Sequence, residues 1–389
     1  MMLDVLCVMD PRFAGGTASA VATDIGAMLD AGLSVGLFEV QSPYLAKDPG
    51  PRSKVMEKLV QDRRLYVFPA VSQQEIEANT VFLHHPMTFF YGLETKVRIK
   101  SDRAFLVAHH MPFRGDGSLQ YEPVTTSHRV QRDTGLAPVW LPVSGLCRKH
   151  LQSFHPLIRL SPTDWPNLFD VTEWGLEREI FDGKTTTIGR HGRADPLKWP
   201  DSAAKIRASL PVLQDTQIAV MGCPKDRLLA MGVELSDWTL LDFDQEPVPA
   251  FLNRLDVFVY HFHPDWSETF GRTVAEAMLS GCVCVLDPRI KATFGDLAIY
   301  CEPEETAAVI EKLRRNPQEA RALARRARDA IAKRHDIRSI MDRLAALTSG
   351  RGEIAPASPA FASPVTVLRK TIGMMRRREY LRSDLGVGR

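Results

Sequence analysis

The sequence contains no apolar run of roughly 20 residues, the length that a helix needs to cross a bilayer. Its first residues also lack the basic segment and the long apolar stretch of a signal peptide. We therefore interpret residues 1–8 as the beginning of a buried strand. These two absences exclude an integral membrane protein of the helical type, and we expect a cytoplasmic protein.

An excess of charge of one sign is missing as well. Lys and Arg number 49 and Asp and Glu number 47, which leaves a formal net charge of +2. So small a net charge gives no overall attraction to nucleic acid, and the chain has no motif of interleaved aromatic and basic residues. We therefore expect no nucleic-acid partner.

Cysteine is scarce, and no two cysteines form a C-x-x-C pair. The chain has 6 cysteines, most of them within or beside apolar runs. This placement is typical of reduced thiols buried in a cytosolic protein, so we expect neither disulfides nor a cysteine metal site. The cysteines are Cys7, Cys147, Cys223, Cys282, Cys284 and Cys301.

A regular succession of short apolar runs and helical patterns begins at the N-terminus. An apolar run at 3–9 is followed by a loop with Gly15 and Gly16, a helical pattern at 17–29 and a second apolar run at 33–40. This order predicts a parallel βαβ unit. Further expected strands lie at residues 65–68, 81–83, 105–108 and 139–143.

The same succession restarts after the Trp165-Pro166-Asn167 segment. The second set of expected strands lies at residues 185–188, 217–221, 239–241, 256–260, 282–286 and 297–300. With 389 residues the chain is too long for one ordinary core, so we expect an α/β protein of two Rossmann-like, doubly wound domains. The expected parts are a first domain at 1–165, a second at 166–348, a proline-rich linker at 349–364 and a basic tail at 365–389.

The segment 263–281, HPDWSETFGRTVAEAMLSG, carries the most chemical information. It follows an expected buried strand and places Glu268 in a loop that ends at Gly271, with Glu276 inside a helix at 272–279. Backbone N–H groups at such a helix start bind anions, and carboxylates accept hydrogen bonds from sugar hydroxyls. Because open α/β sheets bind ligands at the carboxyl ends of their strands, we expect a ligand site here.

This arrangement resembles the E-x7-E signature of the retaining glycosyltransferases of family 4, which have the GT-B fold. The match includes Phe270-Gly271 and the run Glu276-Ala-Met-x-x-Gly. The resemblance implies two Rossmann-like domains that face a central cleft, with the acceptor domain first and the nucleotide-sugar domain second. It further implies that Glu268 holds donor-sugar hydroxyls, that backbone N–H groups near Phe270 and Gly271 contact the donor, and that Glu276 binds the ribose.

A second match lies upstream, where Gly189-Arg190 ends an expected strand and Lys198 follows. The resemblance implies that Arg190 and Lys198 bind the donor diphosphate. The physical reason agrees, because a departing nucleoside diphosphate gains negative charge that two fixed cations stabilise. Arg193 is a rival for part of this role.

Two features of the first domain also resemble the family. Gly15-Gly16 is similar to its glycine loop, whose backbone approaches the donor phosphates or the acceptor. His109 ends the strand at 105–108, in the place of a histidine that contacts the donor sugar, and His110 is the alternative. A purely structural histidine is the competing interpretation of either.

Three further patterns invite a metal-site interpretation that we do not favour. They are Asp242-x-Asp244, the group His261, His263 and Asp265, and the pair His84-His85. The first is short enough to occur by chance, and the two histidine groups lack the spacing of known zinc sites. We expect no metal and no cofactor, with the nucleotide sugar acting as a substrate.

The resemblance implies a metal-independent transferase of the hexosyltransferase type. Its partners would be a nucleotide-sugar donor and a glycan or lipid-linked acceptor, in the synthesis of bacterial surface polysaccharide. The alternatives are a nucleotide-sugar epimerase or phosphorylase of the same fold and a non-catalytic transferase-like subunit. A dinucleotide-dependent oxidoreductase is the least supported, because the chain lacks G-x-G-x-x-G with a following acidic residue.

The basic tail combines cations with apolar residues at helical spacing. Leu368, Ile372 and Met375 lie at i, i+4 and i+7, which places them on one helical stripe. Basic residues beside such a stripe suit the headgroup region of an anionic membrane, and peripheral contact with the inner membrane face is one interpretation. A helix that packs on the first domain and a solvated charged tail are the alternatives.

Overall fold

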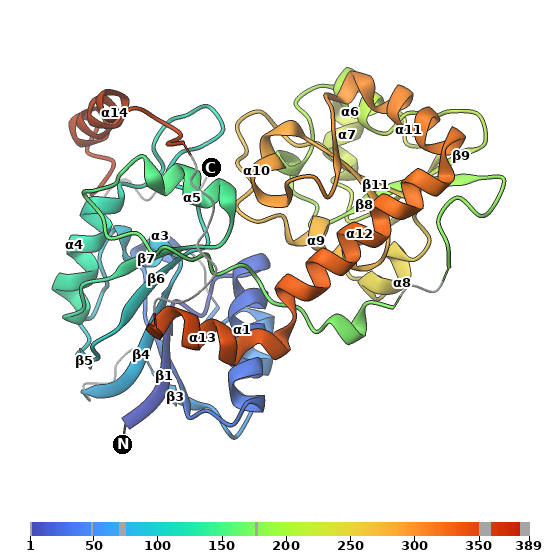
Figure 1. Cartoon of the computed structure of the whole chain (residues 1–389). Coiled ribbons are helices and arrows are strands. Elements are labelled where there is room, and N and C mark those ends of the chain that lie inside the picture. The colour runs from blue at the N-terminus through green and yellow to red at the C-terminus, as the bar shows by residue number, and fades with distance from the viewer. Residues whose placement is uncertain (1, 48–49, 70–74, 176–177, 350–358, 382–389) are drawn as a thin grey trace. The chain divides into compact units, whose positions relative to one another are not determined.

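The computed structural model of the chain describes residues 2–47, 50–69, 75–175, 178–349 and 359–381. The chain divides into two compact units (Figure 1). The first unit comprises Met1–Leu168 and Ile337–Arg389, and the second comprises Phe169–Asp336. Each unit is built on one parallel sheet with helices, and we describe each by itself.

The first unit contains a sheet with the strand order β3-β2-β1-β4-β6-β7, and β5 pairs with β4. Its paired strands are all parallel. The strand β1 and the second half of β4 are mostly apolar and buried, as expected for strands that helices cover on both faces. The strands are β1 (Met2–Met9), β2 (Val35–Glu39), β3 (Tyr66–Phe68), β4 (Ile76–His84), β5 (Ile99–Lys100), β6 (Ala104–Ala108) and β7 (Val139–Pro142).

The helices of the first unit connect these strands and include two that follow the second unit in sequence. They are α1 (Gly16–Asp30), α2 (Lys54–Leu59), α3 (Pro86–Phe90), α4 (Pro123–Thr134), α5 (Gly145–Gln152), α13 (Ile340–Ser349) and α14 (Pro364–Arg376). The helix α4 shows why such segments begin and end where they do. The carboxylate of Glu122 accepts bonds from the first N–H groups, and Gly135 ends the helix in the left-handed conformation.

The second unit has a sheet with the order β10-β9-β8-β11-β12-β13, again with parallel pairs. Numbered within the unit this is 3-2-1-4-5-6, the order of a dinucleotide-binding Rossmann sheet. Buried Ile188, Val220, Val259 and Val285 form part of its core. The strands are β8 (Thr186–His191), β9 (Thr216–Met221), β10 (Trp238–Leu241), β11 (Val257–Tyr260), β12 (Val283–Leu286) and β13 (Ile299–Tyr300).

The helices of the second unit include α9, which was expected at 272–279 and spans Arg272–Leu279. The long helix α12 buries an alanine-rich stripe, with Ala320, Ala324 and Ala327 each no more than 3% exposed. The helices are α6 (Ala203–Ser209), α7 (Lys225–Ala230), α8 (Val248–Leu252), α9, α10 (Lys291–Phe294), α11 (Thr306–Arg315) and α12 (Pro317–His335).

The structure divides the chain differently from the expected domains at 1–165 and 166–348. Residues 337–348 were expected in the second domain but belong to the first unit. The reason is local packing, since α13 lies beside α1 in Figure 1 and contacts it. Arg343 donates to the carbonyl of Pro166 at 2.6 Å and lies over the ring of Trp165. Most of the expected linker at 349–364 lies outside the described residues, as do residues 382–389 of the tail.

Two expectations from composition can be compared with the described residues. All six cysteines are buried and unpaired, as expected. Burial raises the pKa of the Cys147 thiol to about 12, which makes it a poor nucleophile at neutral pH. Among the described residues, no helix combines the length and the apolar character needed to cross a bilayer.

Candidate functional site

The strand order of the second unit reverses between β8 and β11, and most of the expected donor-binding residues gather there. Ligands of doubly wound sheets bind at the carboxyl ends of the strands on either side of such a reversal. The strand β8 ends with Arg190 and His191, and β11 ends with Tyr260. The segments that follow these strands carry Lys198 and Glu268.

Arg190 is a buried cation held by backbone carbonyls and aromatic rings. It is 3% exposed, and it donates to the carbonyl oxygens of His261 at 3.0 Å and Lys198 at 2.5 Å. Its guanidinium carbon lies 4.2 Å from the ring centre of Trp199 and 4.8 Å from that of Tyr260. Burial lowers the pKa of Arg190 to about 10, so the side chain stays charged at neutral pH. Among the described residues it pairs with no carboxylate, so its charge is available to an anion.

Glu268 and Lys198 form an ion pair beside this arginine. The ammonium of Lys198 lies 3.3 Å from Oε2 of Glu268. The same oxygen accepts a hydrogen bond from the Tyr260 hydroxyl at 2.5 Å and one from the Trp266 indole at 3.2 Å. These donors all converge on one carboxylate oxygen. Within the described chain no hydrogen bond reaches Oε1, which is therefore the atom that can accept a bond from a ligand.

The charge state of Glu268 follows from these contacts. Burial alone would raise the pKa of this carboxyl, which is only 8% exposed. The charge of Lys198 and the hydrogen bonds from Tyr260 and Trp266 outweigh burial and hold the pKa below its ordinary value. Glu268 is therefore ionised at neutral pH and acts only as a hydrogen-bond acceptor.

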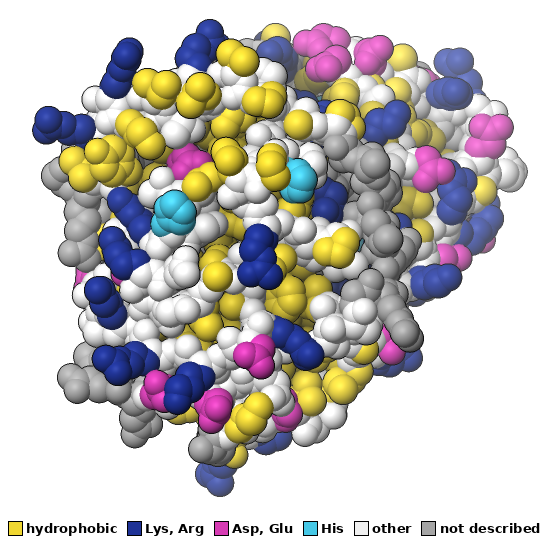
Figure 2. Space-filling model, turned by 60° about the vertical axis from the view of Figure 1, so that its left-hand side comes forward, with side chains coloured by type: hydrophobic (Ala, Val, Ile, Leu, Met, Phe, Trp, Pro, Cys, Tyr) yellow, Lys and Arg dark blue, Asp and Glu magenta, His cyan; other side chains and the backbone are white. Residues whose placement is uncertain are grey.

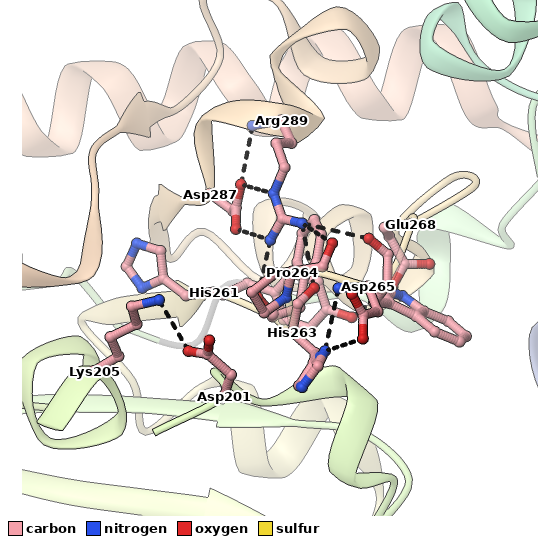
Figure 3. Close-up of polar contacts among 12 residues, drawn as sticks. Asp201, Lys205, His261, His263, Pro264, Asp265, Glu268, Asp287 and Arg289 are labelled. Atoms are coloured by element: carbon pink, nitrogen blue, oxygen red, sulfur yellow. Dashed lines mark hydrogen bonds and ion pairs between the residues drawn. The ribbon is translucent and has the colours of Figure 1, made fainter. Parts of the chain in front are cut away.

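Arg289 fixes the loop that leads into the first glutamate of the motif. Its guanidinium donates to the carbonyls of Phe262 at 2.9 Å, His263 at 3.2 Å and Pro264 at 3.1 Å. Asp287 holds the guanidinium in turn, with an Nη2 to Oδ2 distance of 2.6 Å. Figure 3 shows Arg289 and Asp287 lying over this loop. Arg289 was not predicted from the sequence, because no local pattern reveals which carbonyls a side chain on another element will reach.

Gly271 occupies a conformation and a space that suit only glycine. It precedes α9 in the left-handed conformation with φ 81°. A Cβ atom there would lie 2.8 Å from Cδ1 of Ile290 and 3.2 Å from the ring of Phe294. The neighbouring side chain of Phe270 is 5% exposed and packs against Phe294 and His335. Phe270 can therefore meet a ligand only through its backbone.

Glu276 lies in α9 and is held on both oxygens. Nε of Arg272 donates to Oε1 at 3.0 Å, and Nε2 of His191 lies 3.2 Å from Oε2. Burial would raise the pKa of Glu276, but the contact with His191 and the charge of Arg272 outweigh it and lower the pKa. His191 and Arg272 were not predicted from the sequence. Their signals are the position next to Arg190 at the strand end and the i, i+4 spacing to Glu276.

A small hollow opens at the ends of β8 and β9. A Cβ atom on Gly222 would lie 1.8 Å from the carbonyl oxygen of Gly192, so only glycine allows these two backbones to approach. The arginine Arg193, the rival cation, is exposed at the rim. The lining residues are Arg190, His191, Gly192, Arg193, Lys198, Trp199, Met221 and Gly222.

The first unit brings its own candidate residues to the carboxyl ends of β1 and β6. Gly15 precedes α1 with φ 68°, and Gly16 is the first residue of that helix. His109 directly follows β6, and its Nε2 lies 3.1 Å from Nδ1 of His84 at the end of β4. Burial lowers the pKa of His109 to about 3, so both rings are neutral at neutral pH.

The alternative histidine, His110, lies in a second ring stack. Its ring centre is 5.5 Å from that of His85, which in turn stacks on Phe13 at 4.0 Å. The buried Nε2 of His110 has no hydrogen-bond partner in the described structure. His109 therefore has a positioning partner in His84, and His110 has a side-chain hydrogen bond with Gln120.

The patterns that we did not interpret as metal sites are not drawn together. Asp242 is exposed and pairs with Lys225 at 3.2 Å. His261 is buried against the carbonyl of Cys301, whereas His263 contacts Asp265, and Figure 3 shows the two histidines apart. Across the described residues, no group of three or more His, Cys, Asp or Glu side chains is placed to hold a metal ion.

Comparisons with known sequences locate a similarity in the second half of the chain. Residues 192–346 match the family described as glycosyl transferase-like. Curated relatives named D-inositol 3-phosphate glycosyltransferase, from the Mycobacterium sp. strains KMS and JLS, are 26% identical over 180 residues. That match covers 40% of this chain and 38% of each relative. The chain therefore spans less than two fifths of the length of these relatives.

Solved structures resemble almost the whole chain. Anabaena HepE in complex with UDP and glucose has a TM-score of 0.60 and 12% sequence identity, covering 90% of this chain and 100% of that one. TarM has a TM-score of 0.60 and 11% identity, covering 89% and 98%. At these identities the likeness shows the fold.

Proposed function

We propose that this protein, which has the GT-B fold and carries a glycosyl transferase-like domain at residues 192–346, transfers a sugar from a nucleotide-diphosphate sugar with retention of configuration. The observation that carries the proposal is the cluster of Arg190, Lys198, Tyr260 and Glu268 at the point where the strand order of the second unit reverses. The acceptor is a glycan or a lipid-linked molecule, and the context is the synthesis of bacterial surface polysaccharide.

The two cations suit the diphosphate. Lys198 extends its ammonium from the segment after β8, and its pair with Glu268 at 3.3 Å leaves further N–H donors. Arg190 donates to the backbone carbonyl of Lys198, is charged and has no carboxylate partner among the described residues. When the glycosidic bond breaks, negative charge grows on the leaving phosphate, and preorganised cations stabilise that charge more than the ground state.

The two glutamates suit the two ends of the donor. Glu268 is ionised and offers Oε1 to a sugar hydroxyl. Glu276, fixed by Arg272 and His191, accepts hydrogen bonds from the ribose diol. The structures of HepE with UDP and with UDP-glucose support a nucleoside diphosphate as the shared part of the donor.

The reaction needs no metal in this proposal. The acceptor hydroxyl attacks the anomeric carbon from the face that the nucleoside diphosphate leaves. A phosphate oxygen of the leaving group accepts the acceptor's proton, so no enzymic base is obligatory. His109, neutral and positioned by His84, offers one ring nitrogen to the donor sugar.

A screen of nucleotide sugars tests the proposal. Transfer to glycan and lipid-linked acceptors, and slow hydrolysis of the donor, are measured by the release of nucleoside diphosphate. We expect Lys198→Ala to lower kcat by about 100-fold or more, the loss usual for one preorganised donor. Lys205→Ala is the matched control, because that lysine makes only an exposed pair with Asp201 at 2.9 Å.

Three outcomes contradict this proposal. Equal activity of Lys198→Ala and Lys205→Ala removes the role of the cation. Formation of an epimer without transfer in the same screen identifies the alternative activity. Loss of activity with a chelator that magnesium or manganese restores would show that the reaction needs a metal. Asp242 and Asp244 would then be candidate metal ligands.

A further inference from the structure

The C-terminal helix α14 is firmly seated on the first unit. Before the helix, Phe361 stacks on His150 with ring centres 4.0 Å apart, and its N–H donates to the carbonyl of Lys149 at 3.0 Å. Within the helix, Val367 and Met374 are 7% and 2% exposed. These contacts fix which side of α14 faces the protein.

The other side of α14 is apolar and exposed. Val365, Leu368, Ile372 and Met375 are 77%, 61%, 40% and 52% exposed. At about 100° per residue, this spacing places the four side chains within an arc of about 80°. Val367 and Met374 lie outside that arc on the buried side. We call these four residues the exposed stripe. A helix that only packs on its own domain would show polar residues here.

Cations border the exposed stripe. Arg369 and Arg376 follow the stripe at about 20–40° around the helix, both are exposed, and neither makes an ion pair with a described residue. Between residues 359 and 381 the basic residues are Arg369, Lys370, Arg376, Arg377 and Arg378, and the acidic residue is Glu379. Glu379 is already paired with Arg377. Figure 2 shows hydrophobic side chains gathered next to Lys and Arg side chains at the upper left of this face.

We propose that α14 docks the first unit on the surface of an anionic lipid bilayer. The exposed stripe enters the boundary between headgroups and acyl chains, and Arg369 and Arg376 contact lipid phosphates. A stripe one side chain wide with cations along its border fits this interface. The core of a protein–protein interface is instead depleted of charge, and a protein partner would have to match these arginines with carboxylates.

Vesicle cosedimentation of the full-length protein tests the docking without any donor or acceptor. The vesicles contain phosphatidylcholine alone or a mixture with phosphatidylglycerol. We expect binding to the anionic vesicles that weakens as salt rises and is much weaker on neutral vesicles. Leu368→Ser with Ile372→Ser should reduce the affinity for anionic vesicles by about tenfold or more, because two exposed apolar side chains that would enter the bilayer are lost.

Matched variants separate the stripe and its cations from general effects. Arg369→Glu with Arg376→Glu should abolish the preference for anionic vesicles. Arg325→Glu with Lys333→Glu changes the net charge equally on exposed positions of α12 and should leave binding unchanged. Val212→Ser with Leu229→Ser removes exposed apolar side chains of the second unit and should also leave it unchanged. Thermal melting verifies that each variant is folded.

Three results overturn the proposal. The first is equal recovery of the wild-type protein with neutral and anionic vesicles. The second is unchanged binding of both α14 variants. The third is self-association of the wild-type protein that the Leu368→Ser and Ile372→Ser changes abolish while vesicle binding persists, which would make the exposed stripe an interface between copies of this chain.

Discussion

At the scale of single residues, Glu268 owes its ionised state to neighbours on two different elements. Three donors converge on Oε2, and the shortest of these contacts is the 2.5 Å bond from the Tyr260 hydroxyl at the end of β11. Without these contacts, burial of a carboxyl with 8% exposure would raise its pKa. The charge of Lys198 lowers the pKa of this carboxyl most, and the hydrogen bond from the Tyr260 hydroxyl lowers it further, so the tyrosine contributes to the pH range in which Glu268 can serve as an acceptor.

We expect Tyr260→Phe to move the acid limb of the pH–rate profile toward higher pH. The phenyl ring keeps the stack on Arg190, while the lost hydroxyl removes a bond that lowers the pKa of Glu268. Activity that needs the ionised carboxylate is lost as pH falls through its pKa, so raising that pKa shifts the loss upward. The measurement is kcat/KM against pH, with Tyr66→Phe on exposed β3 as the control. Identical acid limbs for both variants and the wild type would refute the coupling.

At the scale of elements, the start of α9 depends on a glycine that meets two separate demands. Gly271 is left-handed, and it also faces Ile290 and Phe294 at distances that a Cβ atom would make too short. The left-handed conformation is a requirement of the backbone alone. The lack of space for a Cβ atom comes from the packing of α9 against the segment after β12. Because Glu276 lies inside α9, a shift of this helix would move the carboxylate assigned to the ribose.

We expect Gly271→Ala to destabilise the protein more than Gly232→Ala and to weaken nucleoside diphosphate binding. Gly232 has the same left-handed φ of +82° but no atom within 4 Å of an added Cβ, so its substitution costs only about 1–2 kcal/mol of backbone strain. Urea unfolding gives the difference in free energy of unfolding, and calorimetry gives the affinity for nucleoside diphosphate. Equal destabilisation by the two substitutions would show that the contact with Ile290 relaxes freely.

The elements themselves were largely predictable from the sequence, whereas their partners were not. Apolar runs located the strands, and the helix at 272–279 was placed correctly, because both depend on local periodicity. The fold was predictable because the segment that contains Glu268 and Glu276 resembles the signature of a known family. Arg289 and Tyr260 escaped prediction because their roles depend on side chains that meet across the sheet. The return of residues 337–348 to the first unit was missed for the same reason.

At the scale of the whole molecule, the two units have similar sheet topologies but differ in the side chains that they bury at the carboxyl ends of their strands. Both units place charged groups at the carboxyl ends of their strands, such as Asp10 and Arg12 after β1, but the first unit also buries neutral histidines there. Burial lowers the pKa of His109 and of His150 to about 3, and it also lowers the pKa of His84, His85 and His110. The protonation of the first unit therefore differs between its folded and unfolded states at mildly acidic pH.

We expect this difference to destabilise the first unit as the pH falls below about 6.5, the ordinary pKa of histidine. Below that pH the histidines of the unfolded chain bind protons, whereas the buried histidines of the folded chain stay neutral until the pH approaches about 3. The free energy of unfolding therefore falls as the pH falls from about 6.5 to about 3. For His150, 2% exposed and stacked on Phe361, the loss between pH 7 and pH 5 is about 2 kcal/mol.

His150→Phe should remove that part of the loss, while His128→Asn at an exposed position should not. Denaturant unfolding at the two pH values, followed by the fluorescence of Trp140 and Trp165, measures the difference. Parallel losses for the wild type and His150→Phe would mean that His150 takes up its proton in the folded state.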